Sequence, residues 1–370
     1  MDLKELRDKI GKKVKGTHIA ILSDSDIASS KEMIPTPAHD LNRILSGSVY
    51  KGLPSKTLTL LIGPEASGKS SLMCLCLAEA QRKGYKPIII DTEGAWDKDF
   101  VKRWDLNPDE MLYVYTPWVD QACIVLANLI DSGETKLAIA VDSVGGLEKK
   151  KLLDDSLGGD VKADQGTLQK EIKRMLKLLL NVCKGQDSIA MMGGHYYGNP
   201  TGYGEADKVG GGHFTKLAPD IIVALKNTKV FEDPNAAAKD KVIIGNKITA
   251  ITTKNRYYPP FNEATIDINY RDGINKYAGM LELAVKAELI TQAGAWFNFP
   301  DGTKLQGAVS ALEYMNGNTE LLDKIDKWLE TTGYSTINSN VADAIALAEK
   351  VPDNPEDEAP KIKLKRNGKK

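Results

Sequence analysis

Apolar and polar positions follow one another in short blocks that predict strands separated by helices. Apolar runs of strand length occupy residues 57–63, 87–93, 137–143, 188–194 and 221–226. Stretches with helical periodicity fill three of the intervals, at 70–84, 122–130 and 166–185. Short, continuously apolar strands alternating with helices are typical of a mostly parallel sheet covered on both faces. We therefore expect an α/β fold for the main body of the chain.

The later part of the chain has a different pattern. Strands are predicted at 242–255 and 264–270 with no helix between them, which indicates an antiparallel edge. A small mixed α+β domain is expected over residues 274–335, with helices at 308–315 and 320–330. Residues 336–370 end in DNPEDEAP and the basic KIKLKRNGKK, and are expected to be a largely disordered tail.

An N-terminal arm over residues 1–33 precedes the core domain at 34–273. Its first part places Leu3, Leu6, Ile10 and Val14 at helical spacing among charged residues, which predicts an amphipathic helix. A strand is expected to follow within residues 16–26. The apolar stripe must be buried either on its own domain or on a neighbouring subunit, and composition alone favours its own domain.

Composition limits the classes of function. The 370 residues are 42% hydrophobic and 27% charged, as in ordinary globular proteins, and the net charge is −1. Any contact with nucleic acid must then come from local loops. No apolar run approaches the ~20 residues that span a membrane, so no membrane partner is expected. The four cysteines match no zinc pattern, and without a signal peptide they are expected to be buried thiols in a cytoplasmic protein.

A phosphate-binding loop is the clearest chemical signal. GPEASGKS at 63–70 matches G-x-x-x-x-G-K-[ST], follows a predicted strand and opens a predicted helix. Its glycines let backbone N–H groups surround phosphate oxygens, Lys69 places a charge on the β- and γ-phosphates, and Ser70 can bind Mg²⁺. The residues expected to bind ATP here are Gly63, Pro64, Glu65, Ala66, Ser67, Gly68, Lys69, Ser70 and Ser71.

Three polar residues end neighbouring strands at the same predicted edge. Asp142 closes an apolar strand and is expected to hold Mg²⁺ together with Ser70. Glu93 could accept a proton from the water that attacks the γ-phosphate, although a solvated strand end is the alternative. His195 could sense the γ-phosphate, but as a lone histidine a structural role is favoured from the residues alone.

Two long stretches leave the same edge, at about 148–165 and 195–213. The second contains six glycines and three tyrosines, and the basic Lys216 follows it closely. Long loops of this kind are usually functional, and Gly-rich backbone with aromatic and basic residues suits single-stranded DNA. A lid over a small substrate is an equal alternative from the sequence alone.

These motifs together resemble the RecA family of DNA recombinases, both its bacterial RecA and its phage UvsX members, from about residue 11 to residue 335. The matching segments are GPEASGKSSL, IIIDTEGAWDKDF, LAIAVDSVGGL, GNPTGYGEADKVGGGHFTK, ITTKNRYYPPF and INKYAGMLELAVKAELITQAGAWFNF. The last is the most specific, because ATPase chemistry does not require it.

The resemblance implies a function and a set of residue roles. It implies an ATP- and Mg²⁺-dependent homologous recombinase with a RecA-like ATPase core, forming a helical filament on single-stranded DNA and exchanging strands with homologous duplex. Glu93 would be the catalytic base, Asp97 and Phe100 would contact adenine, and Lys254 and Arg256 would contact the ATP of the neighbouring protomer. The implied DNA contacts are Gln165, Lys170, Lys177, Asn199, Gly211, Gly212 and His213.

The resemblance also bears on partners. It implies that the arm docks on the adjacent subunit, which reverses the expectation from composition. It also implies a single-strand-binding protein and a recombination mediator as candidate partners. RecA has Gln where this chain has His195, whereas UvsX has His, which adds weight to a phage origin. The rival functions are a hexameric helicase or ring motor, which should lack the GAWF module, and a nucleotide-gated adaptor without catalysis.

Overall fold

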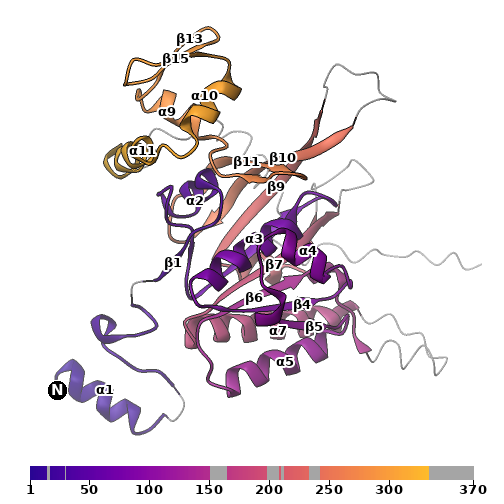
Figure 1. Ribbon diagram of the computed structural model, residues 1–370. Helices are drawn as coiled ribbons and strands as arrows, with labels where there is room; N and C mark the ends of the chain where they lie inside the picture. The colour runs from indigo at the N-terminus through magenta and orange to yellow at the C-terminus, as the bar shows by residue number, and fades with distance from the viewer. Residues whose placement is uncertain are drawn as a thin grey trace, which may run out of the picture.

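The computed structural model describes residues 1–14, 17–29, 31–150, 165–197, 208–209, 212–232 and 242–332. Within these ranges the chain forms a large α/β core, a small C-terminal domain and an N-terminal arm that projects from the core (Figure 1). The expected tail lies outside the described residues, as do most of the two expected DNA loops. No helix in the described ranges is both long and apolar enough to cross a membrane.

One ten-stranded sheet forms the centre of the core. Its order is β12-β11-β10-β9-β3-β7-β6-β4-β5, with β8 paired to β7. The bounds are β3 Thr57–Gly63, β4 Lys86–Asp91, β5 Leu112–Tyr115, β6 Leu137–Asp142, β7 Ile189–Tyr197, β8 Lys208–Val209, β9 Ile221–Phe231, β10 Ile243–Asn255, β11 Glu263–Asn269 and β12 Gly273–Asn275. Strands β5, β4, β6, β7, β3 and β9 are parallel, and β9 to β12 are antiparallel. The expected parallel sheet with an antiparallel edge is confirmed.

Helices cover both faces of this sheet (Figure 1). The core helices are α2 His39–Ser46, α3 Lys69–Arg82, α4 Lys98–Arg103, α5 Val119–Asp131, α7 Gln165–Gly185 and α8 Phe214–Leu217. Helices α2, α3 and α4 share one apolar cluster with the sheet, and α5 and α7 share another. Leu58, Leu60 and Ile62 belong to the second cluster and Leu61 to the first, because successive side chains of a strand point to opposite faces.

Two short elements and three 3₁₀ turns complete the core and the arm. β1 (Met33–Ile34) pairs with β2 (Leu53–Pro54) in an antiparallel ladder. The 3₁₀ turns are Leu22–Asp24, Pro108–Glu110 and Val144–Gly146. All four cysteines are buried free thiols, as the sequence predicts.

The C-terminal domain has its own apolar core. It consists of α9 (Met280–Lys286), β13 (Thr291–Ala293), β14 (Trp296–Asn298), β15 (Lys304–Gln306), α10 (Ala308–Met315) and α11 (Thr319–Thr332). The three strands form an antiparallel sheet, and Phe297, Ile325 and Leu329 are among the buried residues beneath it. The expected mixed character of this segment is confirmed.

The arm begins with α1 (Leu3–Gly11), whose start is fixed by a capping box between Asp2 and Glu5. No residue of α1 is buried, and Leu3 is 70% exposed. The strand expected within residues 16–26 is wrong for the described part of that segment, which has a 3₁₀ turn and no strand. A strand needs a hydrogen-bonded neighbour, and no sheet of the described residues includes this segment, which projects from the core (Figure 1).

Candidate nucleotide and DNA site

The loop between β3 and α3 has backbone positions that only glycine fits. Gly68 has φ +88°, and a Cβ there would lie 2.5 Å from Ile248 Cδ1. A Cβ on Gly63 would lie 2.5 Å from Ser67 Oγ and 2.8 Å from the Leu225 carbonyl oxygen. The loop also includes exposed Pro64, Glu65 and Ala66, and leads into a helix whose first N–H groups have no intrahelical partner. Such a loop at a helix N-terminus is suited to phosphate.

Lys69 lies folded against this loop. Its Nζ donates to the carbonyl oxygens of Gly63 at 3.0 Å and Pro64 at 2.8 Å. Burial lowers the pKa of Lys69, while the carboxylates of Asp142, Glu93 and Glu65 act in the opposite direction. The third donor of the ammonium makes only a long contact of 3.5 Å to Ser67 Oγ, which a phosphate oxygen can replace.

Asp142 and Ser70 meet at the end of β6. The Ser70 hydroxyl donates to Asp142 Oδ2 at 2.5 Å, and Trp96 Nε1 donates to the same oxygen at 2.9 Å. Burial raises the pKa of Asp142, and these two hydrogen bonds oppose the rise. The half-buried Ser71 follows on the same helix.

The donor set at Ser70 and Asp142 fits Mg²⁺. It consists of a hydroxyl and a carboxylate oxygen, the hard donors that this ion prefers. The described residues contain no group of three or more His, Cys, Asp or Glu side chains that could hold a metal ion. A Mg²⁺ ion held by these two side chains would take its other ligands from phosphate oxygens and water, as is common at nucleotide sites.

Glu93 and His195 lie at the same edge. Ser143 Oγ donates to Glu93 Oε1 at 2.8 Å, and His195 Nε2 lies 3.8 Å from that oxygen. The Glu93 side chain is 49% exposed, so water has access to the carboxylate. The β3–β7 ladder pairs Gly63 with His195, which puts the histidine beside the phosphate loop. Strand β7 continues two residues beyond His195, whereas the sequence places the loop start there.

Asp91 holds the turn that carries Glu93, a role that sequence reasoning missed. The side chain is completely buried and accepts from the backbone N–H groups of Glu93 at 3.1 Å, Gly94 at 2.8 Å and Trp96 at 3.0 Å. The aspartate two to five residues before these N–H groups, followed by a glycine, was the available signal. Trp96 and Ser143 were also missed, and each makes its site contact only through the fold.

Asp97 and Phe100 lie on the next helix. Asp97 caps α4 by accepting from the Phe100 N–H at 2.7 Å. The Phe100 and Trp96 rings meet edge to face, with 5.2 Å between their centroids. An open, mostly apolar pocket of about 360 Å³ has Asp97, but not Phe100, in its lining. It is lined by Trp96, Asp97, Lys98, Val101, Pro108, Met111 and Tyr113. A planar apolar base has room there.

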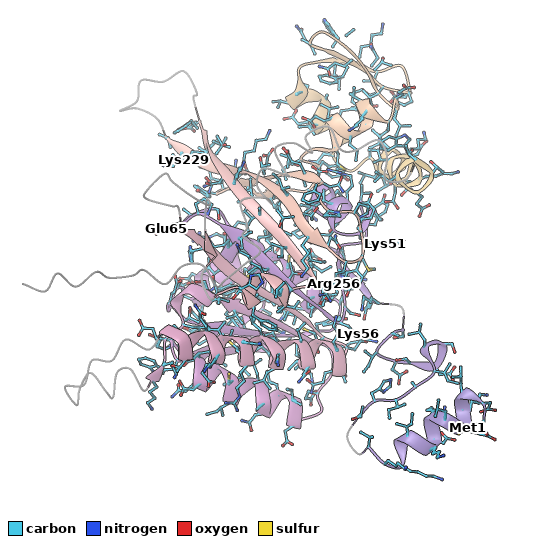
Figure 2. The ribbon with its side chains drawn as sticks, turned by 180° about the vertical axis from the view of Figure 1, so that it is seen from behind. Met1, Lys51, Lys56, Glu65, Lys229 and Arg256 are labelled. Atoms are coloured by element: carbon cyan, nitrogen blue, oxygen red, sulfur yellow. The ribbon has the colours of Figure 1, made fainter. Side chains whose placement is uncertain are left out.

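Lys254 and Arg256 lie at the opposite edge of the sheet from the phosphate loop. Strand β10 runs antiparallel to β9, so its end at Asn255 pairs with Ile221 at the start of β9. Figure 2 shows Glu65 and Arg256 at opposite ends of the sheet. Through β9 the register sets Asn255 level with Thr59, four residues before Gly63, which is about 13 Å along the strands at ~3.3 Å per residue, and two strands away across the sheet. The two residues, called the basic pair below, therefore lie far from the nucleotide site of their own chain.

The expected DNA contacts divide between two elements. Lys170 and Lys177 are exposed on α7, two helical turns apart and on the same face. Gly212 has φ +85° and lies against the side chain of Gln169, which brings the segment before α8 to the start of α7. His213 is exposed beside it. Asn199, Gly211 and the side chain of Gln165 lie outside the described part of the chain.

Comparison with known families decides the assignment. The RecA N-terminal domain family matches residues 2–275, and the RecA C-terminal domain family matches residues 278–331. The chain belongs to the RecA family of recombinases. Both matches agree with the fold, since the first covers the α/β core and the second covers the small C-terminal domain.

Curated relatives named Protein RecA agree with this family assignment. The chain is 28% identical to that of Rickettsia bellii over 315 residues, which cover 82% of this chain and 88% of the relative. It is 30% identical to the protein of Cereibacter sphaeroides, in a match that covers 74% of this chain and 78% of the relative. It is 31% identical to the protein of Borreliella burgdorferi, in a match that covers 75% of this chain and 74% of the relative. Nothing in these matches favours the helicase or ring motor. The phage origin stays a prediction.

Proposed function

We propose that this RecA-family chain is a DNA-dependent ATPase that assembles into a helical filament on single-stranded DNA and exchanges strands with homologous duplex. One observation carries the proposal furthest. The phosphate loop and the basic pair lie at opposite edges of one sheet, so one chain does not supply both to a single nucleotide. A head-to-tail contact that joins the two edges is heterologous, and it builds an open helical filament unless its rotation closes a ring.

In this proposal the chain's own residues bind and orient ATP. The N–H groups of residues 64–70 and the Lys69 ammonium hold the phosphates, and the base lies at Asp97 and Phe100. Ser70 and Asp142 would hold Mg²⁺, which supplies charge neutralisation at the phosphates when bound. Glu93 orients the attacking water and accepts its proton, and the 3.8 Å contact with His195 makes that histidine a sensor of the γ-phosphate.

The basic pair completes the site of the next protomer. Lys254 and Arg256 would bind the terminal phosphates in trans and stabilise the charge that develops there. Because the contact crosses the subunit interface, ATP binding and filament geometry are coupled, and ATP is required for the active filament.

DNA binding in this proposal is local. The net charge of −1 gives the whole surface no general attraction for DNA. The exposed Lys170 and Lys177, with the Gly212–His213 turn, contact the sugar-phosphate backbone of the DNA. Asn199, Gly211 and Gln165 are proposed to extend the same surface. Homology is read by base pairing, with the protein holding the strand. A single-strand-binding protein and a recombination mediator remain candidate partners.

The exposed arm supports assembly. Helix α1 buries none of its residues, and its apolar stripe has no partner within the described chain. Strand β5 is an edge strand with Leu112, Tyr113 and Tyr115 exposed, so its free hydrogen-bonding groups can accept another strand. We propose that the arm of one protomer docks at the β5 edge of the next, where residues 17–21 gain the strand partner that they lack.

The proposal is tested by electron microscopy of the full-length protein on single-stranded DNA with a non-hydrolysable ATP analogue. Extended helical filaments are expected, and K254A/R256A should form none under the same conditions. R271A, which removes an exposed arginine at the far end of the antiparallel edge, is the matched control and should form filaments. Closed rings would contradict the recombinase and favour a ring motor, and bare DNA would favour an adaptor.

A further inference from the structure

A buried carboxylate lies at the base of the basic pair. Asp220 immediately precedes β9, and its side chain is only 1% exposed. Its Oδ2 accepts from the Leu58 backbone N–H at 3.1 Å, which fixes it against the start of β3. A charge removed from water in this way is costly unless other groups compensate it.

Two cations compensate Asp220, from different elements. Lys184 Nζ near the end of α7 lies 3.1 Å from Oδ2, and Arg256 Nη1 lies 3.3 Å from Oδ1. The Arg256 backbone N–H also donates to the Asp220 carbonyl oxygen at 3.2 Å. Although anchored at these points, the Arg256 side chain is 55% exposed, so the rest of the guanidinium is open to an incoming group.

The surrounding backbone fixes the other half of the pair. Lys254 Nζ donates to the Leu217 carbonyl oxygen at 2.9 Å, at the end of α8. The β9–β10 ladder has a register shift between Thr252 and Lys254, and such an irregularity changes the direction of the following side chains. Asn255 Nδ2 donates to the Leu45 carbonyl oxygen at 3.0 Å, which ties the same turn to the end of α2.

We infer that Asp220 is a positioning residue for the trans contact, holding the Arg256 guanidinium at the subunit edge until the triphosphate of the neighbouring protomer engages it. The inference rests on the trans role of Arg256 proposed above. Asp220 lies at the edge opposite its own phosphate loop, so its effect on hydrolysis must pass through the neighbour. It touches neither substrate nor reacting atoms in this arrangement.

The test uses D220N, which keeps the shape and an oxygen for the Leu58 N–H but removes the charge that holds Arg256. We expect ATP binding by the free protomer to be unchanged and kcat for DNA-dependent hydrolysis in filaments to fall at least about tenfold. K184M is the matched control: it also removes one partner of Asp220 but leaves Arg256 in place. It should lower thermal stability with little effect on kcat.

Mixed filaments separate a trans effect from a folding defect. E93Q has an inactive hydrolytic site but supplies an intact basic pair, and D220N has the reverse. In a one-to-one mixture about a quarter of the head-to-tail interfaces join the two intact halves, so about a quarter of the wild-type rate should return. A structural defect in D220N would damage its own nucleotide site, and no activity would return.

Each outcome bears on one claim. Once both proteins are shown to be present in the filaments, R256A mixed with E93Q must regain activity, and failure there would overturn the trans role itself, whatever Asp220 does. If R256A complements but D220N hydrolyses ATP normally alone, or stays inactive in the mixture, the positioning role is overturned. Should D220N fail to fold, D220N/K184M replaces the buried ion pair by a neutral pair and is put through the same mixing test.

Discussion

At the scale of single residues, the two ends of the core sheet hold charges in opposite ways. At the phosphate-loop edge, a buried Asp142 is held by Ser70 and Trp96, and Lys69 is held by backbone carbonyl oxygens. At the other edge, a buried Asp220 holds the exposed Arg256. The first arrangement fixes the groups proposed to bind the chain's own nucleotide, and the second leaves a cation exposed for the proposed contact with a neighbour.

Replacement of Glu93 tests the proposed base. E93Q keeps the size of the side chain but cannot accept a proton, so we expect hydrolysis to slow about 10²–10⁴-fold. ATP binding should be retained, because Lys69 and the loop N–H groups are untouched. Single-turnover hydrolysis and nucleotide binding are measured on the same preparation. Normal turnover would assign the base to another residue, and lost binding would indicate a structural role.

Lys254 should make the activity sensitive to alkaline pH. Burial, and after it the charge of Arg256, lower the pKa of Lys254. The charged form of Lys254 therefore predominates only below this lowered pKa, and the trans contact weakens as the pH rises through that pKa. We expect the DNA-dependent ATPase rate to fall at a lower pH than an ordinary lysine would allow.

The matching variant is K254R, whose guanidinium stays charged across the accessible range. Its rate should persist to higher pH than that of the wild type, and profiles from about pH 7 to about pH 10 will show the difference. K83R, an exposed lysine at the end of α3, is the control and should follow the wild type. Coincident K254R and wild-type profiles would remove Lys254 from the alkaline limb.

At the scale of elements, the arm and the β5 edge each have apolar side chains that are exposed in the described part of the chain. L3S/L6S/I10S should leave the unfolding midpoint unchanged, because α1 buries no residue. Filament assembly should weaken by about a hundredfold or more, since losing about 3 kcal/mol of apolar burial costs two powers of ten. Sedimentation of filaments on single-stranded DNA measures the assembly.

The control for the arm lies on the same helix. D8S/K12S changes two exposed charged residues on the side opposite the apolar stripe and leaves net charge unaltered. Its assembly should match that of the wild type. Equal weakening in both variants would mean that helix propensity, and not the stripe, is what matters. A lowered unfolding midpoint in the stripe variant would mean that the arm packs on its own chain.

At the scale of the whole molecule, a loop of the core fastens the C-terminal domain. The buried Val49 donates its backbone N–H to Asp326 Oδ1 at 2.8 Å, and the Tyr50 hydroxyl donates to Asp323 at 2.6 Å. Val49 is part of the apolar core of the C-terminal domain. These contacts between one loop and α11 add to those of α2, where the His39 and Tyr277 rings meet edge to face, in holding the domain on the core.

Loss of the Asp326 contact should loosen this attachment. D326A leaves a buried N–H unpaired, which costs about 1–3 kcal/mol, whereas Y50F removes a bond at a partly exposed site and costs about 0.5–1.5 kcal/mol. Hydrogen exchange at the Val49 amide, together with urea unfolding, measures both. E330A, exposed on the same helix, should have no effect. The reverse order of D326A and Y50F would contradict the proposed weight of the buried contact.

The sequence by itself determined most strands of the core sheet, the phosphate loop and the mixed character of the C-terminal segment. These features are written in local terms: apolar runs predict buried strands, and the glycines at 63 and 68 permit the backbone of the loop. Helices α2 and α4 and strand β5 were not predicted, because they are short and their periodicity is weak. The strand within residues 16–26 was predicted wrongly, because pattern alone does not supply a partner.

Only the tertiary structure decided which residues meet. Strand order and direction put Lys254 and Arg256 at the edge opposite the phosphate loop, although the sequence places all of them at the ends of apolar strands. Arg256 meets the buried Asp220 across 36 positions of sequence, and Trp96 meets Asp142 across 46. Periodicity encodes the environment of one segment, whereas such contacts arise from the packing of several segments, which a local pattern does not contain.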